Sequence, residues 1–133
     1  MDGIIETLQH LGETTIFIKL MALTKLEEKL NTEGPFTIFA PNDEAFSELP
    51  AEIFQELTAN LESLREILFY HIVPGELMSE ELIANPVITT LEGEDLLVEI
   101  LDDTLEVNDA AIITPDVPYF NGWIHVIDAV LMP

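Results

Sequence analysis

Three histidines, His10, His71 and His125, are the residues of this chain best suited to acid–base chemistry or metal binding. No two of them stand four residues apart on one predicted helix, the spacing at which paired imidazoles bind zinc. His125 lies at the centre of the apolar run 123–127, where a buried polar side chain is normally hydrogen bonded. The pattern therefore favours structural histidines over a metal site.

The serines and glycines do not form a catalytic or phosphate-binding motif. Ser47, Ser63 and Ser79 lie at predicted helix starts or on helix faces, and none stands in a G-x-S-x-G sequence. Six glycines provide no phosphate-binding loop. Carboxylate pairs are frequent in so acidic a chain, but a glycosidase needs two at a defined separation in a cleft. We expect a non-enzymatic protein without a cofactor.

The charge is strongly negative and unevenly distributed. Asp and Glu number 26 against 4 Lys and Arg, which gives a formal net charge of −22, and no base follows Arg65. This charge repels nucleic acid and anionic membranes. A solvated, solubilising surface is the favoured interpretation, and a weak Ca²⁺ site without an EF-hand loop is the alternative. Eight acids lie close together in the second half of the chain: Glu92, Glu94, Asp95, Glu99, Asp102, Asp103, Glu106 and Asp109.

The composition is that of one globular domain over residues 1–133. Hydrophobic residues make up 48% of the chain, enough for a substantial core. Cysteine is absent, which excludes disulfides and cysteine–zinc sites. No segment has the roughly 18 apolar residues that span a bilayer, and no signal peptide is recognisable at the start. Charge repulsion between copies favours a monomer.

The segment 114–123 combines turn residues with aromatic ones. Pro115 and Pro118 restrict the backbone around Asp116 and Val117, which lowers the entropy lost on docking. Tyr119 and Phe120 are adjacent, so one of them faces outward if the segment is a strand. We expect Asp116, Val117, Tyr119 and Phe120 to form a contact surface. The alternative is that one aromatic packs inward while the other covers a sheet edge.

Helical patterns dominate the first half of the chain. Asp2 can cap a helix that Gly12 ends, and Thr24 with Glu27 reads as a capping box. A second helix starts at Thr14 or Thr15 and turns Leu23 inward. Asn42 and Asn60 are N-cap candidates. The expected helices include 51–59, 61–69 and 80–84, and the expected strands are 36–40, 70–73, 87–90, 95–101, 104–108, 111–114 and 123–131. This order predicts an α+β domain with a mostly antiparallel sheet.

Three segments resemble the signatures of the fasciclin-like (FAS1, beta-Ig-H3/fasciclin) domain family. They are GPFTIFAPNDEAFSELP (34–50), LREILFYHIVPGEL (64–77) and NGWIHVIDAVLMP (121–133). Their order and spacing agree with the family over essentially the whole chain. The resemblance implies the FAS1 fold, a compact wedge of mostly antiparallel, sandwich-like sheet with short flanking helices. The motif positions with an implied structural role are Thr37, Phe39, Ala40, Pro41, Asn42, Asp43, Ala45, Phe46, Asn121, Gly122, His125 and Asp128.

The resemblance also implies binding roles. Tyr70 and His71 fall on the family's Tyr-His pair, which is tied to integrin binding in animal adhesion members. A second adhesion segment of those members, Glu-Pro-Asp-Ile-Met, aligns with residues 114–118, where Asp116 matches and Val117 replaces isoleucine.

The family's properties suggest two functions for this chain. The first is a non-enzymatic module that makes adhesion-type contacts with a protein or glycan. The second is a carrier of an apolar small molecule such as a carotenoid or lipid. Family members are secreted, surface-anchored or periplasmic, whereas the lack of a visible export signal leaves the cytoplasm as the alternative.

Overall fold

The computed structural model describes residues 3–132, which form seven helices and seven strands. The helices are α1 (Ile4–Leu11), α2 (Thr15–Thr24), α3 (Leu26–Thr32), α4 (Asp43–Ser47), α5 (Ala51–Ala59), α6 (Leu61–Phe69) and α7 (Ser79–Ala84). The strands are β1 (Phe36–Pro41), β2 (Ile72–Pro74), β3 (Val87–Thr89), β4 (Asp95–Leu101), β5 (Thr104–Val107), β6 (Ala110–Tyr119) and β7 (Gly122–Ile127). The predicted α+β class is confirmed.

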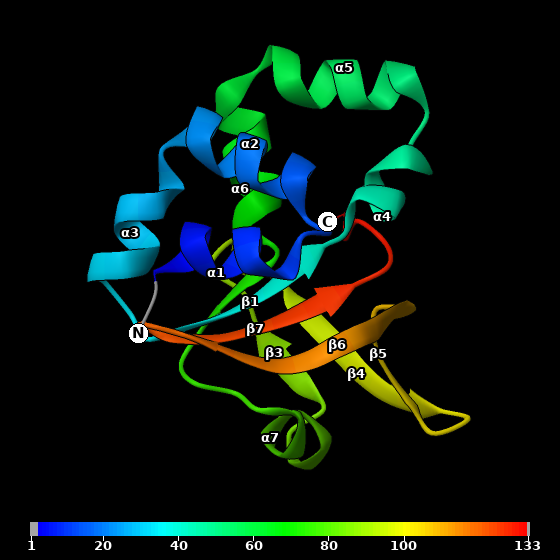
Figure 1. The fold of residues 1–133 in the computed structure, drawn as a ribbon. Coiled ribbons are helices and arrows are strands. Elements are labelled where there is room, and N and C mark those ends of the chain that lie inside the picture. The colour runs from blue at the N-terminus through cyan, green and yellow to red at the C-terminus, as the bar shows by residue number, and fades with distance from the viewer. Residues whose placement is uncertain (1–2, 133) are drawn as a thin grey trace.

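The strands form one sheet in the order β2-β1-β7-β6-β5-β4-β3. The central pair β1 and β7 is parallel, and the other pairings are antiparallel, so the sheet is mixed. The sheet curls so far that its two edges meet, since the Leu91 N–H donates to the Ile72 carbonyl at 2.8 Å. The result is nearly a barrel, with most helices stacked on one side and α7 on the other (Figure 1).

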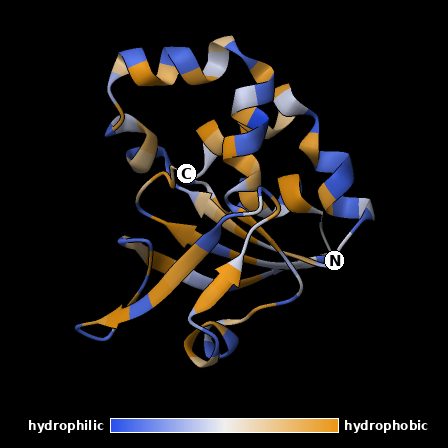
Figure 2. Cartoon of the chain, turned by 180° about the vertical axis from the view of Figure 1, so that it is seen from behind, coloured by the Kyte–Doolittle hydropathy of each residue, from blue (hydrophilic) through white to orange (hydrophobic). Residues whose placement is uncertain are grey.

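Two apolar cores lie on the two faces of this curled sheet. Ile38 and Ala40 of β1 point toward the helices, whereas Phe39 between them points into the sheet's interior. The alternation follows from the period of two along a strand. Both faces of β1 and β7 are therefore covered, and almost every residue of these strands is buried. Figure 2 shows hydrophobic residues interspersed with hydrophilic ones along the helices that cover the sheet.

Several predicted helix ends are confirmed. Gly12 ends α1 in the left-handed conformation, with φ of 75°. The side chain of Asn42 accepts from the Ala45 N–H at 2.8 Å at the start of α4. Asn60 accepts from the N–H groups of Glu62 and Ser63 at the start of α6. Each cap satisfies backbone donors that have no partner within the helix.

The start of α3 differs from the prediction. The hydroxyl of Thr24 donates to the Leu20 and Met21 carbonyls behind it, so the expected capping box with Glu27 does not form. Lys25 occupies the junction between α2 and α3 with φ of 59°. The expected inward position of Leu23 is also wrong, because that face of α2 is exposed. Asp2, the proposed cap of α1, lies outside the described residues.

The later strands also differ at their ends. β6 continues to Tyr119 instead of ending at Thr114, because bulges after Ile112 and Thr114 let the strand change register and keep pairing with β7. β7 ends at Ile127, four residues before the predicted end. Ser79 does not cap α7 with its hydroxyl, which is bonded elsewhere.

Candidate functional site

Asp116 stands at the bulge of β6 and connects three parts of the fold. Its φ of 59° is a left-handed conformation that aspartate tolerates better than most residues. Its carboxylate accepts from the Ser79 N–H at 2.7 Å and from the Ser79 hydroxyl at 2.6 Å. Its own N–H donates to Nδ1 of His125 at 3.1 Å. These bonds fix the bulge against both β7 and the start of α7.

His125 completes this arrangement from inside the sheet. Its Nε2 donates to the Leu77 carbonyl at 2.8 Å, and its ring stacks on Phe39 with the centroids 5.6 Å apart. Burial lowers the pKa of His125, although the Leu77 carbonyl and the carboxylates of Asp116 and Glu81 oppose this effect. The ring is therefore held neutral, with its proton on Nε2.

The three side chains of Ser79, Asp116 and His125 do not form a hydrolytic triad. The Ser79 hydroxyl bonds directly to the Asp116 carboxylate, and both nitrogens of His125 are engaged with backbone groups. A nucleophilic serine needs a base within hydrogen-bond reach whose lone pair is free. The geometry serves to hold a segment in place, and it offers no activated nucleophile.

The two adjacent aromatics point in opposite directions. Tyr119 is only 2% exposed, and its hydroxyl donates to the Leu30 carbonyl at 3.1 Å. Burial raises the pKa of the Tyr119 hydroxyl far above its usual value. Phe120, in contrast, is 62% exposed. The structure thus places Tyr119 in the core and leaves Phe120 at the surface, while half-buried Val117 packs against the same core as Tyr119.

Tyr70 and His71 are both buried beneath the surface. The Tyr70 hydroxyl accepts from Nδ2 of Asn108 at 2.9 Å, and burial raises its pKa. His71 donates from Nδ1 to the Ile67 carbonyl at 2.8 Å and accepts at Nε2 from the Leu131 N–H at 2.9 Å. Full burial lowers the pKa of His71 to about 4. Neither side chain is hydrogen bonded to Asp116 or to its partners. Together they connect the end of α6 to Asn108 and Leu131, which come later in the sequence.

The remaining motif positions hold the elements together. Thr37 donates to the Gly75 carbonyl and accepts from the Leu77 N–H, both at 2.8 Å. Asp43 accepts from the Ile16 N–H at 2.8 Å and the Thr15 hydroxyl at 2.7 Å. Burial alone would raise the pKa of Asp43, but these hydrogen bonds outweigh it and the pKa is lowered.

Side-chain hydrogen bonds also hold the signature segment 121–133 in place. Asn121 donates to the carbonyls of Leu30 and Glu33. Asp128 accepts from the Ala111 N–H at 2.9 Å, which prolongs the pairing of β6 with β7. Five further motif positions are buried in the core or at strand ends: Phe39, Ala40, Pro41, Ala45 and Phe46.

Sequence reasoning missed the partners that make Asp116 and Tyr70 structural. Ser79 lies 37 positions before Asp116, and Asn108 lies 38 positions after Tyr70, so no local spacing links them. Among residues 3–132, no group of three or more His, Asp or Glu side chains converges as a metal site would require. The described helices include none that is long and apolar enough to cross a membrane.

The chain is similar in sequence to several known proteins. The Fasciclin domain family model matches residues 12–133. Protein sll1483 of Synechocystis sp. is 42% identical over 122 residues, which are 88% of this chain and 67% of that protein. Protein sll1735 of the same organism is 33% identical over 132 residues, which are 99% of this chain and 98% of that protein. Transforming growth factor-beta-induced protein ig-h3 of Sus scrofa is 37% identical over 114 residues, which are 85% of this chain but 17% of that longer protein.

A solved structure has the same fold. It is a FAS1 domain pair from the insect cell adhesion molecule Fasciclin I, similar with a TM-score of 0.71 at 23% sequence identity. The similarity covers 92% of this chain and 46% of that chain. The wedge of curled sheet and flanking helices is thus an arrangement that an experimental structure also contains.

Proposed function

Because the chain belongs to the Fasciclin domain family, we propose that it is a non-enzymatic module that makes adhesion-type contacts with a protein or glycan. One observation carries the proposal. The bulge at Asp116 is fixed by three hydrogen bonds, and the short segment that follows it ends in the exposed ring of Phe120. Secretion or display at the cell surface is part of the same proposal.

The contact surface consists of Pro118 and Phe120, with half-buried Trp123 beside them, while Val117 packs inward against the core. Pro118 is exposed and pairs with Trp123 across β6 and β7. The proline restricts the backbone, and the bulge is already fixed before binding, so little conformational entropy is lost on docking. Aromatic side chains on rigid surfaces are frequent anchors of protein contacts and can also stack on sugar rings.

The buried members of the predicted set support this surface from within. Tyr119 fastens the end of β6 to α3, and Asp116 fixes the bulge. We assign Tyr70 and His71 a structural role elsewhere in the fold, because a partner cannot reach side chains that are almost fully buried.

The structure offers less support for a carrier of an apolar small molecule. The interior of the curled sheet is filled by its own side chains, among them Phe39, Leu96 and Val107, which have no exposed surface. A carotenoid or lipid would have to displace them, at the cost of the close packing that stabilises the core.

The test is affinity capture from an extract of the source organism, with wild-type protein and a Phe120→Ala variant as baits. Eluates are analysed for proteins, glycans and extractable small molecules. Removing the ring deletes the most exposed aromatic without touching a core contact, so stability is expected to change by less than about 0.5 kcal/mol. We expect a protein or glycan that wild type retains and Phe120→Ala loses.

The matched control is Leu97→Ala, which truncates an exposed apolar side chain on the outer face of β4. A partner retained by Leu97→Ala and lost by Phe120→Ala assigns binding to the β6–β7 end. A partner held equally by all three baits contradicts the proposed surface. A pigment or lipid in every eluate favours the carrier instead.

A further inference from the structure

A groove with apolar walls lies between the C-terminal end of α2 and the N-terminal end of α6. Its hollow measures about 270 Å³. Leu23 and Leu61 form its apolar walls and are 51% and 50% exposed. The residues that line it are Leu23, Thr24, Lys25, Leu61, Glu62 and Arg65.

The groove also gathers positive charge. The whole chain has 4 bases, and two of them, Lys25 and Arg65, line this one hollow, where Glu62 is the only acid. Arg65 lies over the ring of Phe69, with its guanidinium carbon 5.7 Å from the centroid, and donates to the Thr24 carbonyl at 3.3 Å. Within residues 3–132, neither Lys25 nor Arg65 forms an ion pair with a carboxylate. The groove is therefore complementary to an occupant that is both apolar and acidic.

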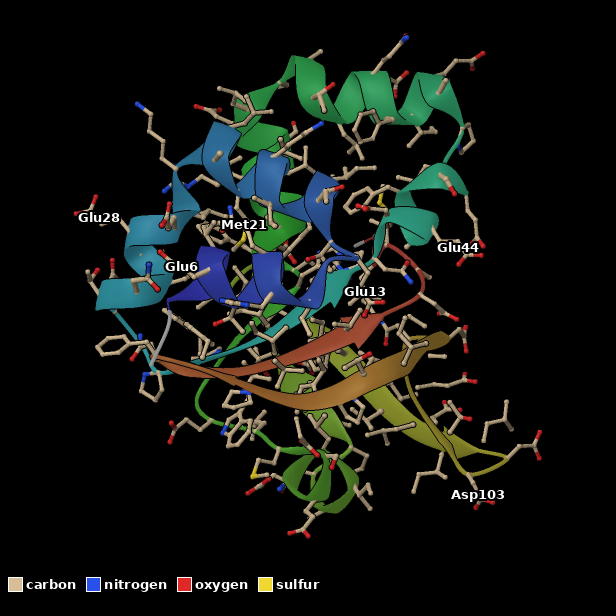
Figure 3. The ribbon with its side chains drawn as sticks, in the orientation of Figure 1. Glu6, Glu13, Met21, Glu28, Glu44 and Asp103 are labelled. Atoms are coloured by element: carbon tan, nitrogen blue, oxygen red, sulfur yellow. The ribbon has the colours of Figure 1, made fainter. Side chains whose placement is uncertain are left out.

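The β4–β5 hairpin of the same protein has that composition. Ile100 and Leu101 are 56% and 57% exposed at the end of β4. Asp102 and Asp103 form the turn itself, with φ of 50° and 65°, the conformation of a tight type I′ hairpin. Figure 3 shows Asp103 at the tip, pointing away from the body of the protein. Two apolar side chains and two carboxylates are thus presented together on a projecting hairpin.

We propose that the tip of this hairpin docks into the α2–α6 groove of a second copy of the chain. The tip and the groove lie at opposite ends of the molecule, so one chain cannot make the contact with itself (Figure 1). The tip enters the groove end-on, so that Ile100 and Leu101, which lie on opposite faces of β4, contact the two walls at Leu23 and Leu61. The turn carboxylates pair with Lys25 and Arg65. Because the two surfaces differ, the contact is head-to-tail and can repeat along a row of molecules.

The contact is weak and depends on concentration. Specific complexes that bury less than roughly 1,200 Å² of surface are usually transient. A hairpin tip in a groove of this size buries much less than that. The net charge of −22 opposes association, but at about 0.15 M salt charges more than roughly 8 Å apart are largely screened. The attraction between the four charges in contact remains. This inference does not depend on the proposed function, since Phe120 takes no part in it.

The test is sedimentation velocity in about 0.15 M NaCl, with the protein raised from micromolar to about millimolar concentration. We expect reversible self-association of the wild type, and at least a tenfold rise in the dissociation constant for Lys25→Gln/Arg65→Gln. Asp102→Asn/Asp103→Asn is expected to weaken association equally, because asparagine keeps the left-handed turn and removes only the charge. The control Lys19→Gln/Lys29→Gln changes the net charge by the same amount outside the groove and should associate as wild type does.

Cross-linking identifies the surfaces directly. A carbodiimide joins a lysine amine to a carboxylate that touches it, and a mixture of ¹⁴N- and ¹⁵N-labelled protein shows whether the two come from different chains. We expect a mixed-isotope cross-link between Lys25 and Asp102 or Asp103. A wild type that stays monomeric over the whole range overturns the proposal, as does association that Lys25→Gln/Arg65→Gln leaves unchanged.

Discussion

The two buried histidines are held as opposite tautomers by the backbone groups around them. A carbonyl can only accept and an N–H can only donate, so the Ile67 carbonyl places the proton of His71 on Nδ1. The Leu77 carbonyl places the proton of His125 on Nε2, since Nδ1 accepts from the Asp116 N–H. Each imidazole thus joins two distant backbone segments, and only its neutral form can do so.

Lowering the pH below the ordinary pKa of histidine should therefore destabilise the protein. Burial lowers the pKa of His71 to about 4, from 6.5 in the unfolded chain. The unfolded state binds the proton first, so the stabilisation is complete above pH 6.5 and is lost as the pH falls toward 4. His71 alone should make the free energy of unfolding roughly 2 kcal/mol lower at pH 5 than at pH 7.5. Urea unfolding at the two pH values measures this difference.

Nuclear magnetic resonance of the ¹⁵N-labelled imidazoles assigns the effect to its source. At pH 6 we expect His71 to carry its proton on Nδ1 and His125 to carry its proton on Nε2. Titration of either ring near pH 6.5, without loss of the folded signals, contradicts the assignment.

The close approach of β1 and β7 depends on one glycine. A Cβ on Gly122 would lie 1.8 Å from the Phe36 carbonyl oxygen, inside the central parallel pair. Gly93 also has a positive φ, at 109°, but nothing lies within 4 Å of the position its Cβ would take. Alanine at either position adopts an unfavourable φ, and only Gly122→Ala adds a backbone clash.

We expect Gly93→Ala to lower the free energy of unfolding by about 1 kcal/mol, and Gly122→Ala to lower it by at least about 2 kcal/mol more or to prevent folding. Urea unfolding of the two purified variants beside wild type checks this order. Equal destabilisation would mean that the strands can separate at little cost.

Elements whose signals are local were predictable from the sequence. The caps at Asn42 and Asn60 depend on residues within three positions, and β4 has the bounds predicted for it, 95–101. The length of β6 was not predictable in this way. The strand continues past Thr114 because Asp116 is hydrogen bonded to Ser79 of α7 and to His125 of β7.

In the candidate site, too, the sequence predicted what depends on neighbouring residues and missed what depends on distant ones. Adjacency predicted that Tyr119 and Phe120 would face opposite ways, but it gave no means of deciding which faces inward. That choice depends on the Leu30 carbonyl, 89 positions away, which accepts from the Tyr119 hydroxyl. Sequence spacing could not show the burial of Tyr70 and His71 for the same reason, since their partners lie in distant strands and in the C-terminal segment.

Charge is distributed unevenly over the whole molecule. All Lys and Arg residues lie between Lys19 and Arg65, in the helix-rich first half of the sequence. After Arg65, the Asp and Glu residues are not balanced by any Lys or Arg. Labelled acidic side chains such as Glu28, Glu44 and Asp103 lie around the periphery and point into solvent (Figure 3). Repulsion among such exposed charges opposes the compact state and is weakened by salt.

Added salt should therefore raise the melting temperature, and the effect should depend on ionic strength more than on the identity of the cation. Within the part of the chain that the structure describes, the carboxylates do not converge and so give Ca²⁺ no set of six to eight oxygens to bind. We expect NaCl and CaCl₂ at matched ionic strength to raise the melting temperature by similar amounts, with MgCl₂ as a second divalent control. Differential scanning calorimetry measures all three. A much larger rise with millimolar Ca²⁺ than with Mg²⁺ would contradict simple screening and would identify a calcium site among these acids.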